Sequence, residues 1–449
     1  MMLDTVRRYA ADRAASRGER AVVLGGSMAG LCAARVLADA FESVTVLDRD
    51  PLPDEPVVRD GVPQSSQPHA MLEAGRATLE DLFPGFCEDL LCAGGLVVDG
   101  GSADFKHYEG GDYLANTPER LPFYTATRAL FEQVTRQHTA DVTGVTLRGN
   151  THFVAYETAG DDDRVTGVQF RDETGAEQSL TADLVVDAMG RTSPTPRWLD
   201  SHGYERPPVD EVEIGVTYSS VDVRRPPEDR RTFFAPPSAP RTRGGIIIPA
   251  ENDRWQVLLQ GVHGDDAPTE PDALQAFADS LPVPEIGEIL AEREWVSEIT
   301  HYPFPANVRR RYETVEPFPD GLVVTGDAIA SFNPVYGQGM SVAALDALQL
   351  HHALADGGLD RLGPRFFDRA ADVVEPVWQI ATGADFEFDA TTGPKPRGVD
   401  LLNRYQARLI DTAHDDGDVT AAFYRVLRLE CPPTELLRPR IAKRVLLPG

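Results

Sequence analysis

The sequence predicts an α/β protein: a Rossmann-like domain with a parallel sheet, an inserted domain with an antiparallel sheet, and a C-terminal helical region. Three observations carry this prediction. Residues 20–50 read as strand, glycine-bearing turn, helix and strand, which is one βαβ unit. Residues 321–354 repeat the order strand, glycine-rich loop and helix. Between them, residues 212–262 alternate apolar and polar side chains with proline-rich breaks, which favours an antiparallel sheet.

The elements between these landmarks follow from periodicity and turn residues. We expect helices around 70–93, 127–138 and 271–280, strands over 151–157, 164–172, 177–182, 182–190 and 296–304, short strands within 99–121, and mostly helix over the last ninety or so residues. The parallel-sheet domain is expected to be discontinuous. Its predicted segments are 18–105, 125–205 and 305–360; the antiparallel domain takes 106–124 and 206–304, and the helical region 361–449.

The composition is that of a globular protein with an extreme charge. The 449 residues are too many for one core and predict two or three domains. Asp and Glu total 71 against 43 Lys and Arg, which gives a net charge of −28, and Lys106, Lys395 and Lys443 are the only lysines. The acids are spread along the chain, so we interpret them as a surface adapted to high salt, typical of a halophile. This charge disfavours nucleic-acid binding.

Cysteine content and hydropathy predict a cytoplasmic protein without metal. The four cysteines are too few for a disulfide framework, and no second pair with metal-ligand spacing accompanies Cys87 and Cys92. No apolar run reaches the ~18 residues of a membrane span. Charged residues follow the twin arginines Arg7 and Arg8 where an export signal would be apolar, so we expect a short N-terminal helix instead. The basic end, 436–449, either touches a membrane or, as we favour, docks on the acidic body.

The stretch GGSMAG, residues 25–30, is a variant of the dinucleotide-binding turn. In that motif the first glycine makes the tight turn and the last lets the helix pack closely on the strand, while the helix N-terminus faces a pyrophosphate. Ser27 stands where a second glycine is usual. Asp48, 18 residues after Gly30, ends the next strand, where an acid can accept hydrogen bonds from a ribose. The residues predicted to bind the cofactor here are Gly25, Gly26, Ser27, Ala29, Gly30, Asp48 and Arg49.

The second glycine-bearing stretch reads GDAIASFNPVYGQGM, residues 326–340. It follows the apolar run 321–325 and precedes a helical pattern over 341–354. A strand, a glycine-rich loop and a helix start together aim backbone N–H groups at an electron-rich ligand. Because no second dinucleotide motif occurs in the sequence, we predict one such cofactor rather than separate sites for two.

These stretches, together with VVDAMGRTS (185–193), resemble the FAD-dependent aromatic hydroxylase family, the single-component flavoprotein monooxygenases. The resemblance implies FAD as the cofactor. It implies that Asp327 binds the ribityl chain and that Arg128, in TRALFE, lies near the ribityl and pyrophosphate groups. The loop that begins at Pro334 would place its amides against the pyrimidine edge of the flavin, and its remaining predicted site residues are Gly337, Gly339 and Met340.

A narrower resemblance is to the branch of this family that includes epoxidases of polyether biosynthesis. The stretches VPQSSQPHAMLEAG (62–75), GRTSPTPRWLDSHGY (190–204), FPANVRRRYE (304–313) and SFNPVYGQGMSVAALDA (331–347) carry it. Two positions depart from the family pattern. Met189 replaces the acid before Gly190, and the arginine after Ser193 comes one residue late, at Arg197. Since that motif also handles the reductant, either NAD(P)H or a separate electron carrier is expected.

The resemblance implies an FAD-dependent monooxygenase. A flavin hydroperoxide would hydroxylate or epoxidise an electron-rich aromatic or alkene substrate, an apolar small molecule, while the second sheet with Trp255 keeps water out. His69 is a candidate catalytic residue, and an ordinary structural hydrogen bond is its alternative. Trp255, Trp295, Tyr302 and Phe304 either line a substrate pocket or belong to the core. His351 and His352 are expected to be structural.

Other functions stay open. A reductase of isoprenoid double bonds, similar to geranylgeranyl reductases, shares both glycine motifs, but the segment GGIIIPAENDRW lacks the Y-x-W-x-F-P sequence of those enzymes. Flavin halogenases are disfavoured because their W-x-W-x-I-P segment and tunnel lysine are missing. A non-catalytic flavin redox sensor is a further alternative.

Overall fold

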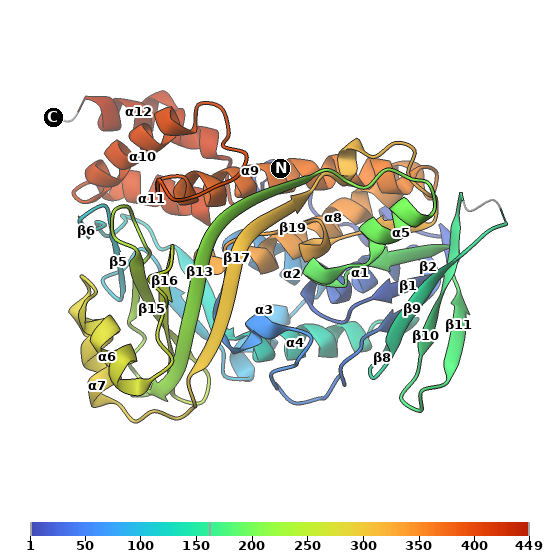
Figure 1. Ribbon diagram of the computed structural model, residues 1–449, viewed down its shortest axis with the longest axis horizontal. Helices are drawn as coiled ribbons and strands as arrows, with labels where there is room; N and C mark the ends of the chain where they lie inside the picture. Colours follow the sequence, from blue (N-terminus) through green and yellow to red (C-terminus); the bar gives the residue numbers. More distant parts are fainter. Residues whose placement is uncertain (1, 161–162, 448–449) are drawn as a thin grey trace.

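The computed structural model describes residues 2–160 and 163–447 (Figure 1). A five-stranded, wholly parallel sheet forms one half of the molecule. In spatial order its strands are β18 (Leu322–Val324), β12 (Leu184–Asp187), β1 (Gly18–Leu24), β2 (Phe41–Leu47) and β8 (Val145–Arg148). Strands β12 and β18 and the last four residues of β1 are buried, as expected for parallel strands covered on both faces, whereas β8 at one edge is partly exposed. The predicted βαβ unit is β1, α1 (Met28–Leu37) and β2.

Helices cover one face of the parallel sheet and a small antiparallel sheet covers the other. On the first face, Val23 and Val46 share a core with α1, α8 (Gly339–Gly357) and α9 (Leu362–Asp385). The same side carries α2 (Glu73–Leu82), α3 (Phe86–Cys92) and α4 (Arg128–Ala140). On the other face, Val22 and Leu24 pack against β9 (His152–Thr158), β10 (Val165–Arg171) and β11 (Glu177–Thr181).

An eight-stranded sheet forms the second half of the molecule (Figure 1). Its order is β19 (Ala330–Ser331), β17 (Thr300–Arg310), β13 (Val209–Arg224), β16 (Arg254–Gly261), β15 (Arg243–Ala250), β14 (Thr232–Ala235), β5 (Phe105–Glu109) and β6 (Asp112–Tyr113). All of these pairs are antiparallel except β14 with β5. The outer face packs on α6 (Pro271–Asp279) and α7 (Pro284–Glu292), so the inner face is left for the space between the two halves.

The remaining elements close the space between the sheets. A three-stranded sheet of β3 (Pro68–Met71), β7 (Pro122–Thr127) and β4 (Leu96–Asp99) lies between α2 and the eight-stranded sheet. The helices α10 (Val399–Ala413), α11 (Gly417–Leu427) and α12 (Pro439–Leu446) form their own core with Leu114 and Leu121. In the basic end, Ile441 and Val445 are buried in that core, and Arg444 pairs with Asp418 at 2.7 Å.

Several sequence expectations differ in detail from the structure. The N-terminal helix is only a 3-10 segment, Ala11–Ala14, and the first helix ends at Leu37 because Phe41 already begins β2. The helix α7 begins at Pro284, which suits the first turn of a helix, and had no prediction. Within the described residues, no helix combines the length and apolarity needed to span a membrane.

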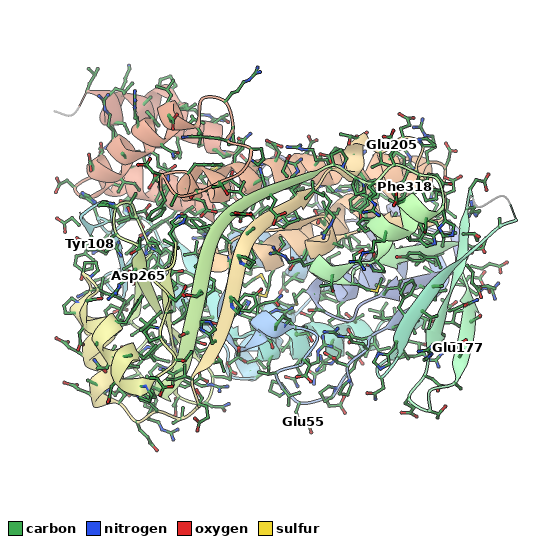
Figure 2. The ribbon with its side chains drawn as sticks, viewed as in Figure 1. Glu55, Tyr108, Glu177, Glu205, Asp265 and Phe318 are labelled. Carbon is green, nitrogen blue, oxygen red and sulfur yellow. The ribbon has the colours of Figure 1, made fainter. Side chains whose placement is uncertain are left out.

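The division into three regions stays a prediction, although the sheets are compatible with it. Strands β5 and β6, from the expected insertion 106–124, lie in the eight-stranded sheet with the strands of 206–304. Helix α9 begins the expected C-terminal region, yet its apolar residues share the core of the parallel sheet. Figure 2 labels Glu55, Glu177 and Glu205, which are exposed acidic residues on the outside of the molecule.

Candidate functional site

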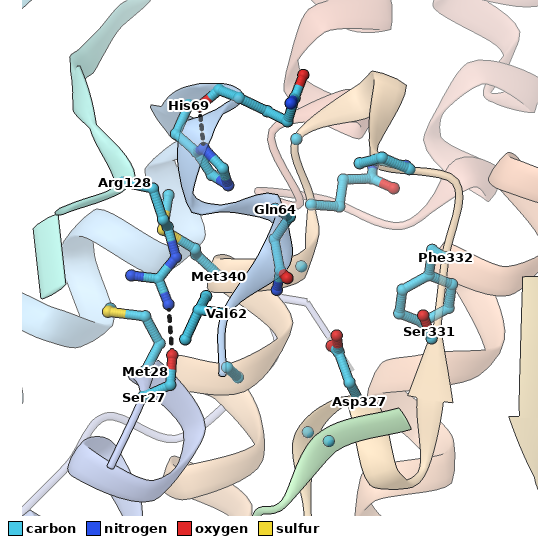
Figure 3. A pocket seen from close by; sticks show the side chains of 18 of the residues that line it. Ser27, Met28, Val62, Gln64, His69, Arg128, Asp327, Ser331, Phe332 and Met340 are labelled. Carbon is cyan, nitrogen blue, oxygen red and sulfur yellow. Dashed lines mark hydrogen bonds between the residues drawn. The ribbon is translucent and has the colours of Figure 1, made fainter. Parts of the chain in front are cut away.

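One cavity of about 740 Å³ lies between the two halves, and both glycine-bearing stretches line it. From the first stretch come Gly25, Ser27 and Ala29, and from the second come Asp327 and the whole loop 334–340. The parallel strands end at this cavity, which is where ligands bind in open α/β sheets. Figure 3 shows Ser27 and Met28 on one side of the space and Asp327, Ser331 and Phe332 on the other. Segments about 300 residues apart in sequence therefore meet at one site.

The turn after β1 needs its first and last glycines for different reasons. Gly25 has a φ of +105°, and a Cβ there would lie 2.5 Å from the carbonyl oxygen of Ala188. A Cβ on Gly30 would lie 1.8 Å from the carbonyl oxygen of Gly25. Neither Gly26 nor Gly30 lines the cavity. Their contribution is to the packing of the turn, which places the start of α1 at the cavity.

Ser27 joins two buried charges beside the start of α1. Its hydroxyl accepts a hydrogen bond of 2.7 Å from Arg128 Nη2 and donates one of 2.7 Å to Glu132 Oε2. Burial tends to raise the pKa of Glu132, but Arg128 and Arg59 outweigh it and hold this pKa below its ordinary value. Arg128 is 3% exposed, and its Nη1 has no hydrogen-bond partner among the described residues. This donor at the cavity is therefore available to an anionic ligand.

The carboxylate of Asp48 is already held on both oxygens. It accepts hydrogen bonds from Gly26 N at 2.5 Å, Asp50 N at 2.8 Å and Arg59 Nη1 at 3.0 Å. A carboxylate has about four acceptor positions, so room is left for one more donor. Arg49 lines the cavity beside it, with a side chain that is 59% exposed.

The loop after β19 is fixed from behind by a buried polar network. Asn333 donates from Nδ2 to Asp385 at 3.1 Å and accepts at Oδ1 from Tyr218, at 2.6 Å, and from Val335 N, at 3.3 Å. Asn307 donates to the other oxygen of Asp385. Burial raises the pKa of Asp385 to about 6, against the two amide donors. These bonds set where the following loop begins.

The loop itself presents its backbone to the cavity, and the carboxyl of Asp327 reaches the same cavity from the 3-10 turn that precedes β19. Gly337 has a left-handed φ of +65°, and Gly339 begins α8 with no atom within 4 Å of where a Cβ would stand. Gly339 lines the cavity and the N-cap residue Gln338 makes no side-chain cap, so α8 begins at the cavity with N–H groups that no capping side chain satisfies. Burial raises the pKa of Asp327, while Arg128 and Arg191 oppose the shift.

His69 lines the cavity as a neutral ring. Its Nδ1 donates to the carbonyl oxygen of Gln67 at 2.8 Å, which leaves Nε2 as the acceptor. Burial, helped by the positive charge of Arg128, lowers the pKa of His69 to about 3. In Figure 3 the two side chains lie on the same side of the cavity. His351 and His352 are in α8, away from the cavity lining, and His352 Nε2 lies 2.8 Å from the carbonyl oxygen of Arg7.

The four aromatic candidates divide between cavity and core. Tyr302 and Phe304, on β17, line the cavity. Trp255 is fully buried on the outer face with α6 and α7, and Trp295 donates from its indole to Leu290 at 2.9 Å in the same region. The prediction that Trp255 helps to cover the site is wrong, because its strand turns that side chain away from the space between the halves.

The two departures from the family pattern, Met189 and Arg197, lie in different surroundings. Met189 lines the cavity, whereas Arg197 is exposed on α5 (Thr195–Ser201) and does not line it. Sequence reasoning missed Asp187, which is fully buried at the end of β12 and accepts hydrogen bonds from the hydroxyls of Ser193 and Thr195. The sequence feature that could have indicated Asp187 is an acidic residue at the end of a buried apolar strand.

Sequence reasoning also missed Arg59 and Glu132, whose side chains lie 2.5 Å apart in the buried network under the first turn. Glu132 had a signal, since it stands four residues after Arg128 on the same helix face. Arg59 lies in a loop without periodicity, so nothing in the sequence marks it.

Comparisons with known proteins agree with this geometry. The family model described as "FAD binding domain" matches residues 108–365. Protein Rv3254 of Mycobacterium tuberculosis is 34% identical over 84% of this chain and 83% of its own length. The structure of the flavin-dependent brominase Bmp2 is similar with a TM-score of 0.66, 17% identity and coverage of 93% of this chain and 95% of that chain. PqsL of Pseudomonas aeruginosa, solved in complex with 2-aminobenzoylacetate, gives a TM-score of 0.60, 18% identity and coverage of 82% and 97%.

The two solved structures establish the fold alone, whereas the family model and the mycobacterial relative establish the family. The chain belongs to the FAD binding domain family of flavoproteins and is an FAD-dependent oxidoreductase.

Proposed function

We propose that this oxidoreductase is a monooxygenase that inserts one oxygen atom, by hydroxylation or epoxidation, into an electron-rich aromatic or alkene substrate. One observation carries the proposal. One cavity is lined both by the two glycine-bearing stretches and by the inner face of the eight-stranded sheet. A substrate on that face would share one enclosed space with the flavin.

The residues of this site fit FAD. The unpartnered Nη1 of Arg128 and the start of α1 together offer donors and positive charge to a pyrophosphate. The open space above Gly339 would be filled by the flavin ring. The residues that we propose to contact FAD, or to pack the turns that do, are Gly25, Gly26, Ser27, Ala29, Gly30, Asp48, Arg49, Arg128, Asp327, Pro334, Gly337, Gly339 and Met340.

FAD would supply the oxygen chemistry. The chain would supply electrostatic stabilisation, hold the cofactor and substrate in position, and exclude water. The N-terminus of α8 carries a partial positive charge that favours a negatively charged pyrimidine edge, by up to ~2 kcal/mol when partly buried. Asn333 and Asp385 hold the loop that leads into this helix. Apolar side chains such as Phe304, Ile246 and Leu258 line the sheet side and would exclude water from the reaction.

Two features of the lining bear on the alternatives. Within the described part of the chain no lysine lines the cavity, which separates it from the halogenase pattern. Either NAD(P)H or a separate carrier protein is proposed as the reductant, because Met189 at the cavity and the exposed Arg197 depart from the family pattern that handles NAD(P)H.

An oxygen-electrode experiment tests the proposal. The protein is purified in high salt, its flavin is released and identified, and the FAD-loaded protein is photoreduced and mixed with oxygen and a panel of uncharged aromatic and alkene compounds. Oxygenated product formed in step with oxygen uptake is the expected result. A saturated product formed without oxygen would show a reductase instead, and the absence of any product would favour a flavin sensor. The rates at which NADH and NADPH are oxidised in the same electrode chamber identify the reductant.

A further inference from the structure

The wall of the cavity on the sheet side is uncharged. Its residues from β14, β15 and β16 are Thr232, Phe234, Ile246, Ile248, Leu258 and Gln260. Within the described residues, no Asp, Glu, Lys or Arg from β13 to β17 lines the cavity. The strand register explains the pattern, because Phe234, Ile246 and Leu258 are direct neighbours across three strands and turn the same way.

Two polar residues stand on this wall, and the hydroxyl of Thr232 also lacks a hydrogen-bond partner among the described residues. Gln260 is the one of the two that carries both a donor group and a separate acceptor. It is 1% exposed, and neither its amide oxygen nor its amide nitrogen has a hydrogen-bond partner among the described residues. A buried primary amide without partners is rare in folded proteins. It pairs in the ladder with Gly244, where a Cβ would stand only 2.7 Å from Gln260 Nε2. The glycine on the neighbouring strand thus leaves the space that the amide occupies.

The charges elsewhere around the cavity are compensated. Each arginine that lines it in the described part of the chain has a carboxylate nearby: Arg49 with Asp50 at 3.7 Å, Arg128 with Glu132 at 3.2 Å and Arg428 with Glu430 at 2.8 Å. On the sheet side, His107 Nε2 lies 2.9 Å from Glu109. None of the arginines that line the cavity in the described part of the chain is therefore left without a carboxylate. Arg191 does not line it, but its guanidinium carbon lies 5.0 Å from the ring centroid of Phe304, on β17.

We infer that Gln260 sets the substrate class: an uncharged, largely apolar ring compound that presents a hydrogen-bond acceptor and donor side by side, such as an amide, a lactam or a hydroxy-carbonyl group. The Gln260 amide offers one donor group and one acceptor, so such a substrate would satisfy both at once. A carboxylate would meet the acceptor oxygen without a compensating cation, and a hydrocarbon would leave the amide unpaired. This inference rests on the proposed function, since it places the substrate in the same cavity.

Three probes with one ring system test this inference: 2-naphthamide, 2-naphthoate and 2-methylnaphthalene. Each is titrated calorimetrically into the oxidised, FAD-loaded protein in high salt, so that no turnover is needed. We expect 2-naphthamide to bind at least tenfold more tightly than either of the other two. In the Gln260→Leu variant this preference should fall below threefold. The affinity for 2-naphthamide should fall because its partner is lost, and the affinity for 2-methylnaphthalene should rise because no amide is left unpaired.

A matched variant separates recognition from folding. Gln256→Leu changes a buried glutamine on the same strand that does not line the cavity, so it should keep the tenfold preference. FAD content and thermal unfolding confirm that each variant is folded.

Equal affinity of the wild type for 2-naphthamide and 2-naphthoate, no binding of any probe, or an unchanged preference in Gln260→Leu would overturn the inference. Because binding is read on oxidised protein, a failure of the oxygen-insertion proposal would appear only in the product assay and would leave these titrations intact.

Discussion

Replacing Gly339 with alanine separates cofactor binding from folding more sharply than any other single change in the site. Gly339 is the first residue of α8, its φ is not left-handed, and no protein atom lies within 4 Å of the added Cβ. Alanine should therefore leave the FAD-free protein as stable as before, or more stable by ~0.5–1 kcal/mol, because alanine has the higher helix propensity. The new methyl group nevertheless enters the space that we assign to the flavin.

The expected effect on cofactor affinity follows from the cost of overpacking. Forcing one methyl group into an occupied contact costs about 1–3 kcal/mol, which corresponds to roughly a 5- to 150-fold rise in the dissociation constant for FAD. Fluorescence titration of the FAD-free protein with FAD measures this constant, and urea unfolding measures the stability of the FAD-free form. An unchanged FAD affinity in Gly339→Ala would show that the start of α8 does not face the flavin.

Gly160→Ala is the matched control for this experiment. Gly160 is exposed, its Cβ would also meet open space, and it does not line the cavity. This variant should change neither the stability of the FAD-free protein nor its affinity for FAD. A loss of FAD affinity in both variants would point to a general effect of the substitution and would refute the geometric reasoning.

Three further predictions concern packing, charge and salt. Gly30→Ala should destabilise the protein by more than ~3 kcal/mol in urea unfolding, since its Cβ would stand 1.8 Å from a backbone oxygen, and a near-wild-type midpoint would contradict the close packing of α1. The pKa of Glu132 is lowered in the folded state, so its ionic contribution to stability is present above about pH 4.5 and is lost as the pH falls through the lowered pKa. The stability advantage of the wild type over Glu132→Gln should accordingly shrink below pH 4.5 in urea titrations, and a pH-independent difference would disprove the assignment. With a net charge of −28, the melting temperature should rise between 0.1 and 2 M KCl in a calorimetric scan, and a flat profile would argue against surface repulsion as the dominant salt effect.

Local patterns predicted the elements that hold the site. The turn at 25–30 and the loop at 326–340 each combine a buried strand, glycines and a helix start within one short segment, so their geometry is set largely by neighbouring residues. The parallel sheet followed from the same signals, because strands that alternate with helices pair in parallel. That the two segments serve one cofactor was expected from the family resemblance, and the structure shows both lining one cavity.

Long-range contacts account for what the sequence did not show. Arg59 meets Asp48, 11 residues before it, and Glu132, 73 residues after it in α4, and no periodicity links the three. The direction in which Trp255 points depends on which face of its sheet receives α6 and α7, and alternation alone leaves both faces possible. Asp385 lies in a helix whose pattern is ordinary, and only the packing of α9 beside Asn307 and Asn333 gives it a role.

The two long strands β13 and β17 run together past the cavity from one half of the molecule to the other (Figure 1). Their ladder is continuous apart from a shift between Glu213 and Val216, where Gly215 has a φ of +57° and the ribbon bends. Rotating one half against the other would bend this two-stranded ribbon, and the hydrogen bonds on both sides of Gly215 oppose the bend. Any change in the width of the cavity must therefore be accompanied by a change in the curvature of these two strands.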